Sequence, residues 1–92
     1  MTTANDANES TLPQPPRTLT AAHNLLARIR PKSTASLEQW LAYYQRSSAL
    51  YAEIAEIDRG HHHEALYWAE RERESANEIK AQISTQLQSG ND

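Results

Sequence analysis

Three consecutive histidines and a glutamate, at 61–64, form the densest group of potential metal ligands in the chain. Neutral imidazole is a good ligand for zinc, copper or nickel. Consecutive residues on a helix point about 100° apart, so the three rings cannot converge on one ion. If the turn is helical, Asp58 pairs best with His61 or His62, whereas a closed zinc site needs about four ligands. The sequence therefore predicts no metal or other cofactor, with His61, His62 and Asp58 as weak metal candidates only.

A pH-sensitive corner is a separate hypothesis for the same histidines. The dipole of a helix N-terminus disfavours a protonated imidazole, and histidine is the side chain that titrates near neutral pH. The simplest interpretation is that these residues are polar groups that fill a turn.

Aromatic side chains lie on both sides of the histidines. The adjacent pairs Tyr43-Tyr44 and Tyr67-Trp68 cannot both point into one narrow apolar stripe, so one member of each lies at its edge or outside. Tyrosine and tryptophan are enriched at interfaces and their hot spots. Two interpretations stay open, a core covered by the first helix or a binding face. The candidate interface residues are Trp40, Tyr43, Tyr44, Tyr51, Tyr67 and Trp68.

No set of residues suggests catalysis. The chain has no cysteine and only two glycines, and it contains no glycine-rich phosphate loop. Serines and histidines occur, but no pattern holds a nucleophile, a base and an orienting group together. We therefore expect a protein that is not an enzyme.

The charge of the chain is unevenly distributed. The net charge is −3, yet residues 17–32 carry four bases and no acid. These bases, Arg17, Arg28, Arg30 and Lys32, are where nucleic-acid binding could begin. They could equally complement the dipole of their own helix C-terminus or pair with the acidic third helix. Because residues 33–92 carry ten acids against five bases, nucleic-acid binding is the less favoured interpretation.

The length of 92 residues predicts one small domain. Its core is small enough that oligomerisation would be a common remedy for low stability. Met1–Asp6 has neither a basic region nor an apolar run, which argues against a signal peptide. No segment approaches the roughly 20 apolar residues of a membrane span. We expect a cytoplasmic protein without a membrane partner.

Residues 1–17 are predicted to be a disordered tail, because they are polar and three prolines forbid a helix. A helical domain follows over residues 18–88. Thr18 or Thr20 is a plausible N-cap for a first helix over about residues 20–30, and Pro31 ends it. Such a helix is too short to be stable alone, so it must dock.

Ser36 and Gln39 match a capping box at the start of a second helix, which should run from about Leu37 to Asp58 or Arg59. A third helix should cover about 62–87, and residues 89–92 should fray. Gly60 lies between the two, where glycine commonly ends a helix because it adopts positive φ without strain. Polar residues interrupt the apolar seam that one continuous rod would need, so we predict an αα-hairpin that turns at Gly60.

Part of the corner resembles a tetratricopeptide repeat. Gly60 followed by Glu64-Ala65-Leu66 is similar to the turn and the start of the second helix in that repeat, with a small residue five positions after the glycine. The other positions of the repeat differ and the chain holds no second copy. The resemblance therefore implies a shared hairpin geometry.

The longer segment over residues 51–74, together with Trp40-Leu-Ala-Tyr-Tyr44, resembles a family of small uncharacterised actinobacterial proteins. The similarity would cover about residues 18–80. That family has no assigned activity, so the resemblance implies a bacterial cytoplasmic protein and no mechanism.

Together these observations predict an all-α protein with a disordered tail, a short helix and a long antiparallel αα-hairpin. The leading hypothesis is a non-enzymatic protein-interaction module that acts through its aromatic face, on another protein or as a homodimer. The alternative is a small nucleic-acid-associated regulator that uses residues 17–32.

Overall fold

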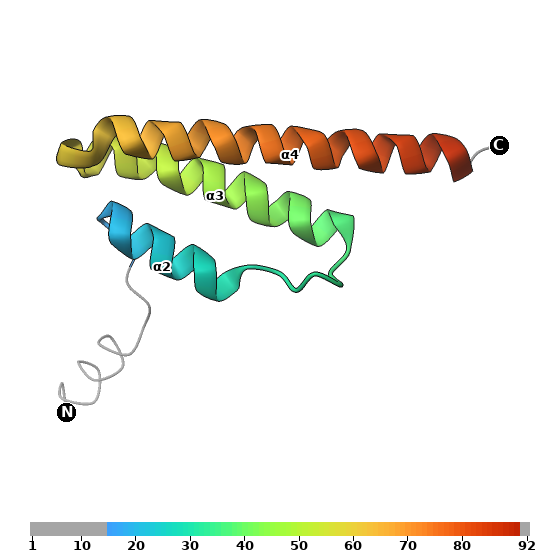
Figure 1. Cartoon of the computed structure of the whole chain (residues 1–92), viewed down its shortest axis with the longest axis horizontal. Helices are drawn as coiled ribbons and strands as arrows, with labels where there is room; N and C mark the ends of the chain where they lie inside the picture. Colours follow the sequence, from blue (N-terminus) through green and yellow to red (C-terminus); the bar gives the residue numbers. More distant parts are fainter. Residues whose placement is uncertain (1–14, 91–92) are drawn as a thin grey trace, which may run out of the picture.

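The computed structural model of the protein describes the backbone of residues 15–90 and the side chains of residues 15–88. These residues form an all-α fold with no strand among them (Figure 1). In chain order the elements are α2 (Leu19–Ile29), α3 (Leu37–Ile57), the short 3-10 helix η1 (Arg59–His61) and α4 (His62–Gly90). The predicted fold class, a short helix followed by a long αα-hairpin, is confirmed.

The predicted boundaries at the two ends of the chain can be compared with the structure only in part. Of the predicted N-terminal tail, residues 1–14 lie outside the described residues, and 15–17 are not helical. At the other end α4 continues through Gly90, past the predicted end at Leu87. Residues 91–92, which belong to the segment predicted to fray, also lie outside the described residues.

Helix α2 begins and ends where local chemistry favours it. The Thr18 side chain accepts a hydrogen bond of 3.1 Å from the Ala21 backbone N–H, which makes Thr18 the N-cap. The helix stops at Ile29, just ahead of Pro31, because a proline pushes the residue before it out of the α region. It buries Leu19, Ala22 and Leu26 as a single stripe.

The predicted capping box opens α3. The Gln39 backbone N–H donates to the Ser36 hydroxyl at 3.1 Å, and the Gln39 side chain accepts from the Ser36 backbone N–H at 3.0 Å. Two donors that have no partner inside the helix are thereby satisfied reciprocally. The start of α3 at Leu37 follows from this pair of bonds.

The chain turns at the predicted corner, but not by the predicted backbone geometry. No glycine among residues 15–90 has a positive φ, so the expectation of a left-handed cap at Gly60 is wrong. Instead, Asp58 caps α3 with φ −101° and ψ 73°, and the chain continues through η1. The His61 backbone N–H donates to the Asp58 carbonyl at 2.9 Å. A 3-10 turn needs no glycine, because all its residues have negative φ.

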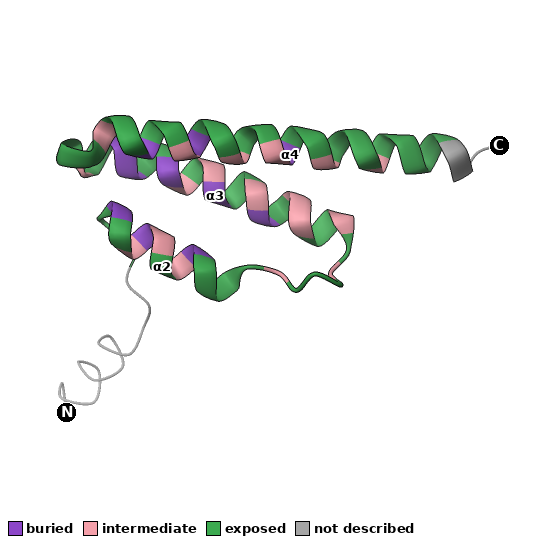
Figure 2. Ribbon diagram, viewed as in Figure 1, coloured by how far each residue is buried: buried purple, intermediate pink, exposed green. Residues whose placement is uncertain are grey.

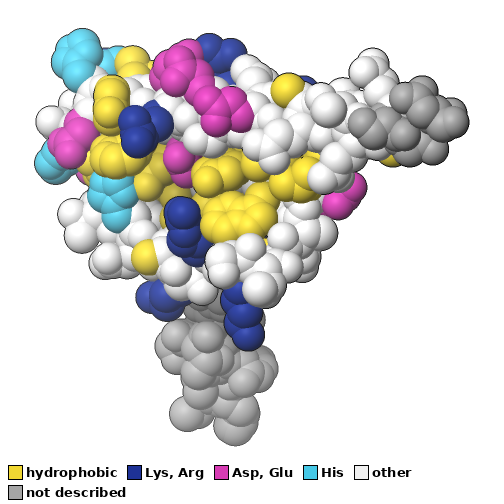
Figure 3. Space-filling model, turned by 45° about the vertical axis from the view of Figure 1, so that its right-hand side comes forward, with side chains coloured by type: hydrophobic (Ala, Val, Ile, Leu, Met, Phe, Trp, Pro, Cys, Tyr) yellow, Lys and Arg dark blue, Asp and Glu magenta, His cyan; other side chains and the backbone are white. Residues whose placement is uncertain are grey.

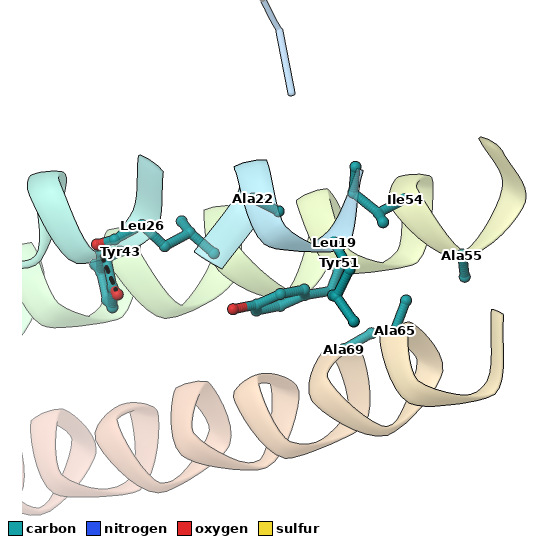
Figure 4. Packing of buried hydrophobic residues seen from close by; sticks show 9 residues of the cluster. All are labelled: Leu19, Ala22, Leu26, Tyr43, Tyr51, Ile54, Ala55, Ala65 and Ala69. Atoms are coloured by element: carbon teal, nitrogen blue, oxygen red, sulfur yellow. Dashed lines mark hydrogen bonds between the residues drawn. The ribbon is translucent and has the colours of Figure 1, made fainter. Parts of the chain in front are cut away.

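Helices α3 and α4 run side by side in opposite directions, and α2 lies along the part of α3 nearest the corner (Figure 1). Most buried residues gather in that part of the hairpin (Figure 2). The core contains Leu19, Ala22, Leu26, Tyr43, Tyr51, Ile54, Ala55, Ala65 and Ala69, and Figure 4 shows these residues converging from the three helices. Three of these residues, Ala55, Ala65 and Ala69, are alanines of α3 and α4 near the corner (Figure 4).

We predict that Gly60→Ala stabilises the protein by about 0.4–1 kcal/mol. The backbone conformation suits an L-residue, and a Cβ at this position would meet nothing within 4 Å. The substitution therefore lowers only the entropy of the unfolded chain. Urea unfolding followed by circular dichroism measures the change. A marked loss of stability would show that the corner depends on a conformation that only glycine adopts.

Candidate interaction surface

The six aromatic residues named from the sequence divide into buried and accessible members. Tyr43 and Tyr51 are in the core, with 8% and 4% of their surface exposed. Trp40, Tyr44 and Trp68 pack against the core and are half-buried. Tyr67 is 56% exposed. Each adjacent pair therefore contributes a more buried and a more accessible ring, as the spacing predicted.

The first group of rings, the Trp40 cluster, consists of Trp40, Tyr43 and Tyr44 on α3. Their ring centroids are 5.5–5.8 Å apart. The Tyr43 hydroxyl donates to the Leu26 carbonyl at 3.1 Å, which fixes this ring beneath α2 (Figure 4). The Arg30 guanidinium lies 5.0 Å from the Trp40 ring centroid, a cation–π contact worth about 0.5–1 kcal/mol at an exposed site.

The second group, the His23 cluster, joins all three helices. His23 of α2 lies 5.3 Å from the ring centroids of both Tyr51 on α3 and Trp68 on α4. Its Nδ1 forms a hydrogen bond of 2.7 Å with the Tyr51 hydroxyl. Burial, with the nearby charge of Glu72, raises the pKa of Tyr51 to about 12. The tyrosine therefore stays a neutral hydrogen-bonding group at physiological pH.

Sequence reasoning missed His23. The signal was present, because His23 lies four residues after Leu19 and three before Leu26, on the buried stripe of α2. A histidine on an apolar stripe needs a polar partner, and the Tyr51 hydroxyl supplies it.

Polar groups also occupy the interface between α3 and α4. Ser47 is fully buried, and its hydroxyl donates to the Tyr43 carbonyl at 2.9 Å. The Ser48 hydroxyl donates to the Ala69 carbonyl at 2.9 Å, which links the two helices directly. Glu72 is half-buried in this region. Burial raises the pKa of Glu72, and the charges of Arg30 and Arg71 partly offset that rise.

The four bases of the predicted nucleic-acid segment do not form one surface. Arg30 lies over the Trp40 ring, whereas Arg28 lines a groove of about 890 Å³ between α2 and α3. Arg17 and Lys32 are exposed outside both helices. Figure 3 shows separate dark-blue Lys and Arg side chains rather than one continuous basic patch on the face in view.

At the corner, the structure brings together only one of the predicted metal-binding pairs. His61 Nδ1 lies 3.0 Å from Asp58 Oδ2. His62 turns away, and its Nδ1 donates to the Ala55 carbonyl at 2.7 Å, because a carbonyl can only accept. Within residues 15–90 no group of three or more potential ligands is placed to hold a metal ion.

The second bond of Asp58 links the corner to α2. Asp58 Oδ2 accepts a hydrogen bond of 2.9 Å from the Leu19 backbone N–H, at the first turn of α2. A carboxylate at this position also complements the positive end of the helix dipole. The Leu19 hydrogen bond lowers the pKa of Asp58 most, the hydrogen bond with His61 and its charge lower it further, and partial burial opposes them.

No protein family model matches the chain, and comparisons with curated proteins and with solved structures find no significant match. None of the helices over residues 15–90 combines the length and apolar character needed to cross a membrane.

We expect Glu72→Gln to raise the free energy of unfolding at about pH 7 more than at about pH 4. The pKa of Glu72 is higher in the folded state, so its ionised form costs stability once the pH exceeds the unfolded pKa. Glutamine keeps the shape and cannot ionise. Glu78→Gln, at an exposed position on the same helix, is the matched control. Thermal unfolding at both pH values measures the difference, and equal gains for the two variants would contradict the assignment.

Asp58→Asn should lower the midpoint of thermal unfolding at neutral pH. In the acid range, the midpoint of this variant should fall less steeply with decreasing pH than that of the parent. The folded pKa of Asp58 is depressed, so its contribution is present above the unfolded pKa of about 3.9 and is lost as pH falls through the folded value. Thermal unfolding of both proteins across the acid range tests this expectation. A variant with the same acid profile as the parent would show that the Asp58–Leu19 bond contributes nothing.

Proposed function

We propose that this chain is a non-enzymatic helical module that binds protein through its aromatic face, the surface around Trp40, Tyr44 and Trp68. One observation carries the proposal. These three large rings are held in place by the core yet remain only half-buried. Rigid aromatic side chains of this kind give large contact area at little entropic cost, which is why tryptophan and tyrosine dominate interface hot spots.

The contacts of the rings support recognition rather than catalysis. The Tyr51 hydroxyl and His23 are hydrogen-bonded to each other, and the pKa of Tyr51 is raised away from the physiological range. A general base is instead expected to have a pKa near the working pH. Asp58 is paired with His61 at the corner and also accepts a hydrogen bond from the Leu19 backbone N–H of α2. These groups therefore have structural partners, and the protein we propose is not an enzyme.

The alternative, a nucleic-acid-associated regulator using Arg17, Arg28, Arg30 and Lys32, has weaker support. Phosphate binding needs several bases aimed at one backbone. Here Arg28 and Arg30 lie on different surfaces, and Arg30 is already engaged by the Trp40 ring. The proposal places the module in the bacterial cytoplasm, with another protein or a second copy of the chain as partner and no membrane.

The test is capture of a partner from an extract of the producing cells, followed by affinity measurement with the purified pair. Trp40→Ala should weaken binding at least tenfold, or about 1.4 kcal/mol. Tyr44→Ala, which removes a smaller half-buried ring, provides a second variant in case Trp40→Ala unfolds. Glu74→Ala, exposed on α4, is the control that should bind as the parent does. A folded Trp40→Ala or Tyr44→Ala protein with unchanged affinity would contradict the proposal.

A further inference from the structure

In the part of the chain that the structure describes, the hairpin has three helices near the corner and two at its other end. Helix α2 ends at Ile29, and the bond from the Tyr43 hydroxyl to the Leu26 carbonyl marks how far it reaches along α3. Beyond that point, among residues 15–90, α3 and α4 have only each other and the linker of residues 30–36 (Figure 1). Buried residues, coloured purple in Figure 2, are sparse in the same region. Two helices alone leave part of each apolar stripe open to water.

Helix α4 also extends beyond the start of α3. Ser48 bonds to the carbonyl of Ala69, so Leu37, eleven residues before Ser48, lies level with Lys80, eleven residues after Ala69. The remainder of α4 has no stretch of α3 beside it, as Figure 1 shows at its C-terminal end. Leu87 lies two turns further along α4 and is 65% exposed.

This end of α4 carries a row of apolar side chains and no charge. Ile79, Ile83 and Leu87 follow each other at intervals of four residues and form one stripe on the helix. No charged residue occurs over residues 81–90, although residues 70–80 are mostly charged. Depletion of charge together with apolar side chains is characteristic of the fully buried centre of an interface.

We infer that the partner covering this end is a second copy of the chain, so that the C-terminal ends of the two α4 helices overlap antiparallel. The inference rests on the proposed function and names its partner. A two-fold axis near Ile83 would place the two stripes against each other, with Trp40 and Tyr44 beside them. A two-fold axis brings the same surface of each protomer together, so a charged residue there would meet a like charge. The end of α4 has no charged residue over 81–90 and so avoids this repulsion.

Charge complementarity favours a second copy over an unrelated protein. Helix α4 has no basic residue in its last turn, so this turn does not itself compensate the negative end of the helix dipole. The overlap brings that end toward the end of α2 and the linker of the other protomer. Arg30, which lies over the Trp40 ring, and Lys32 of the linker lie there, and residues 17–32 contain no acid. Each protomer thus supplies the cations that the other protomer's α4 lacks.

Light scattering after size-exclusion chromatography tests the inference. The parent should have twice the 10.4 kDa mass of the chain, and Leu87→Asp should weaken the dimer at least tenfold. Leu87 is mostly exposed, so this variant should keep its fold, which circular dichroism checks. The matched control is Leu66→Asp, an equivalent change on α4 at the corner end, where Leu66 is 41% exposed. It should remain a dimer.

Cysteine cross-linking tests the geometry, and the chain offers a clean background because it contains no cysteine. Ile83→Cys should form a disulfide-linked dimer under mild oxidation, since a two-fold axis places residue 83 opposite itself. Thr85→Cys, on the opposite side of α4, should cross-link at least tenfold more slowly.

Three outcomes overturn the inference. A parent protein that stays monomeric at every concentration would contradict the inferred dimer. Capture of a different protein through Trp40 would then still support the proposed function. A dimer that Leu87→Asp does not weaken, or equal cross-linking at residues 83 and 85, would place the contact elsewhere, for example at the groove between α2 and α3. A dimer lost in Leu87→Asp but kept in Leu66→Asp, with selective cross-linking at residue 83, supports it.

Discussion

The position of α2 depends on two hydrogen bonds at its opposite ends. At the start, the Leu19 backbone N–H donates to the Asp58 carboxylate at 2.9 Å. Toward the end, the Leu26 carbonyl accepts from the Tyr43 hydroxyl at 3.1 Å. An eleven-residue helix is too short to persist alone in water, so these bonds and the Leu19, Ala22 and Leu26 stripe determine where it lies. They also determine which part of the hairpin remains uncovered.

The same placement explains why some rings are buried and others accessible. A buried tyrosine hydroxyl needs a partner, and α2 presents the Leu26 carbonyl to Tyr43 and His23 to Tyr51. Tyr44 directly follows Tyr43 and points about 100° away around α3, off the side that bonds to Leu26. Trp40 lies about one turn before Tyr43, and the Arg30 guanidinium lies over its ring. The side of α3 that α2 covers therefore decides that Tyr43 is buried and Tyr44 is more accessible.

The end of α2 and the start of α3 were predictable from sequence because they depend on neighbouring residues, whereas α4 runs past its predicted end. The Ser36–Gln39 box and Pro31 act within a few positions, and both operate as predicted. Gly60 shows the limit of such reasoning. Its presence suggested a left-handed cap, but the Asp58 carbonyl and the His61 backbone N–H close a 3-10 turn that a glycine merely tolerates. The position of the corner was predicted correctly and its geometry was not.

Features that join distant parts of the chain could not be predicted in the same way. The contact of Arg30 with Trp40 and the bond between His23 and Tyr51 need the docked position of α2, which no local pattern supplies. Sequence could state that one of Tyr43 and Tyr44 lies inside, but not which. The interface role of the six aromatic residues, and the alternative role of the basic segment, stay predictions.

The intrinsic fluorescence of the two tryptophans depends on whether α2 is docked on the hairpin. Trp68 contacts the imidazole of His23 within α2, and Trp40 contacts the guanidinium of Arg30 directly after it. Detachment of this helix would remove a polar or charged neighbour from each indole at once. Emission from the unlabelled chain thus distinguishes a hairpin with its third helix from a bare pair of helices.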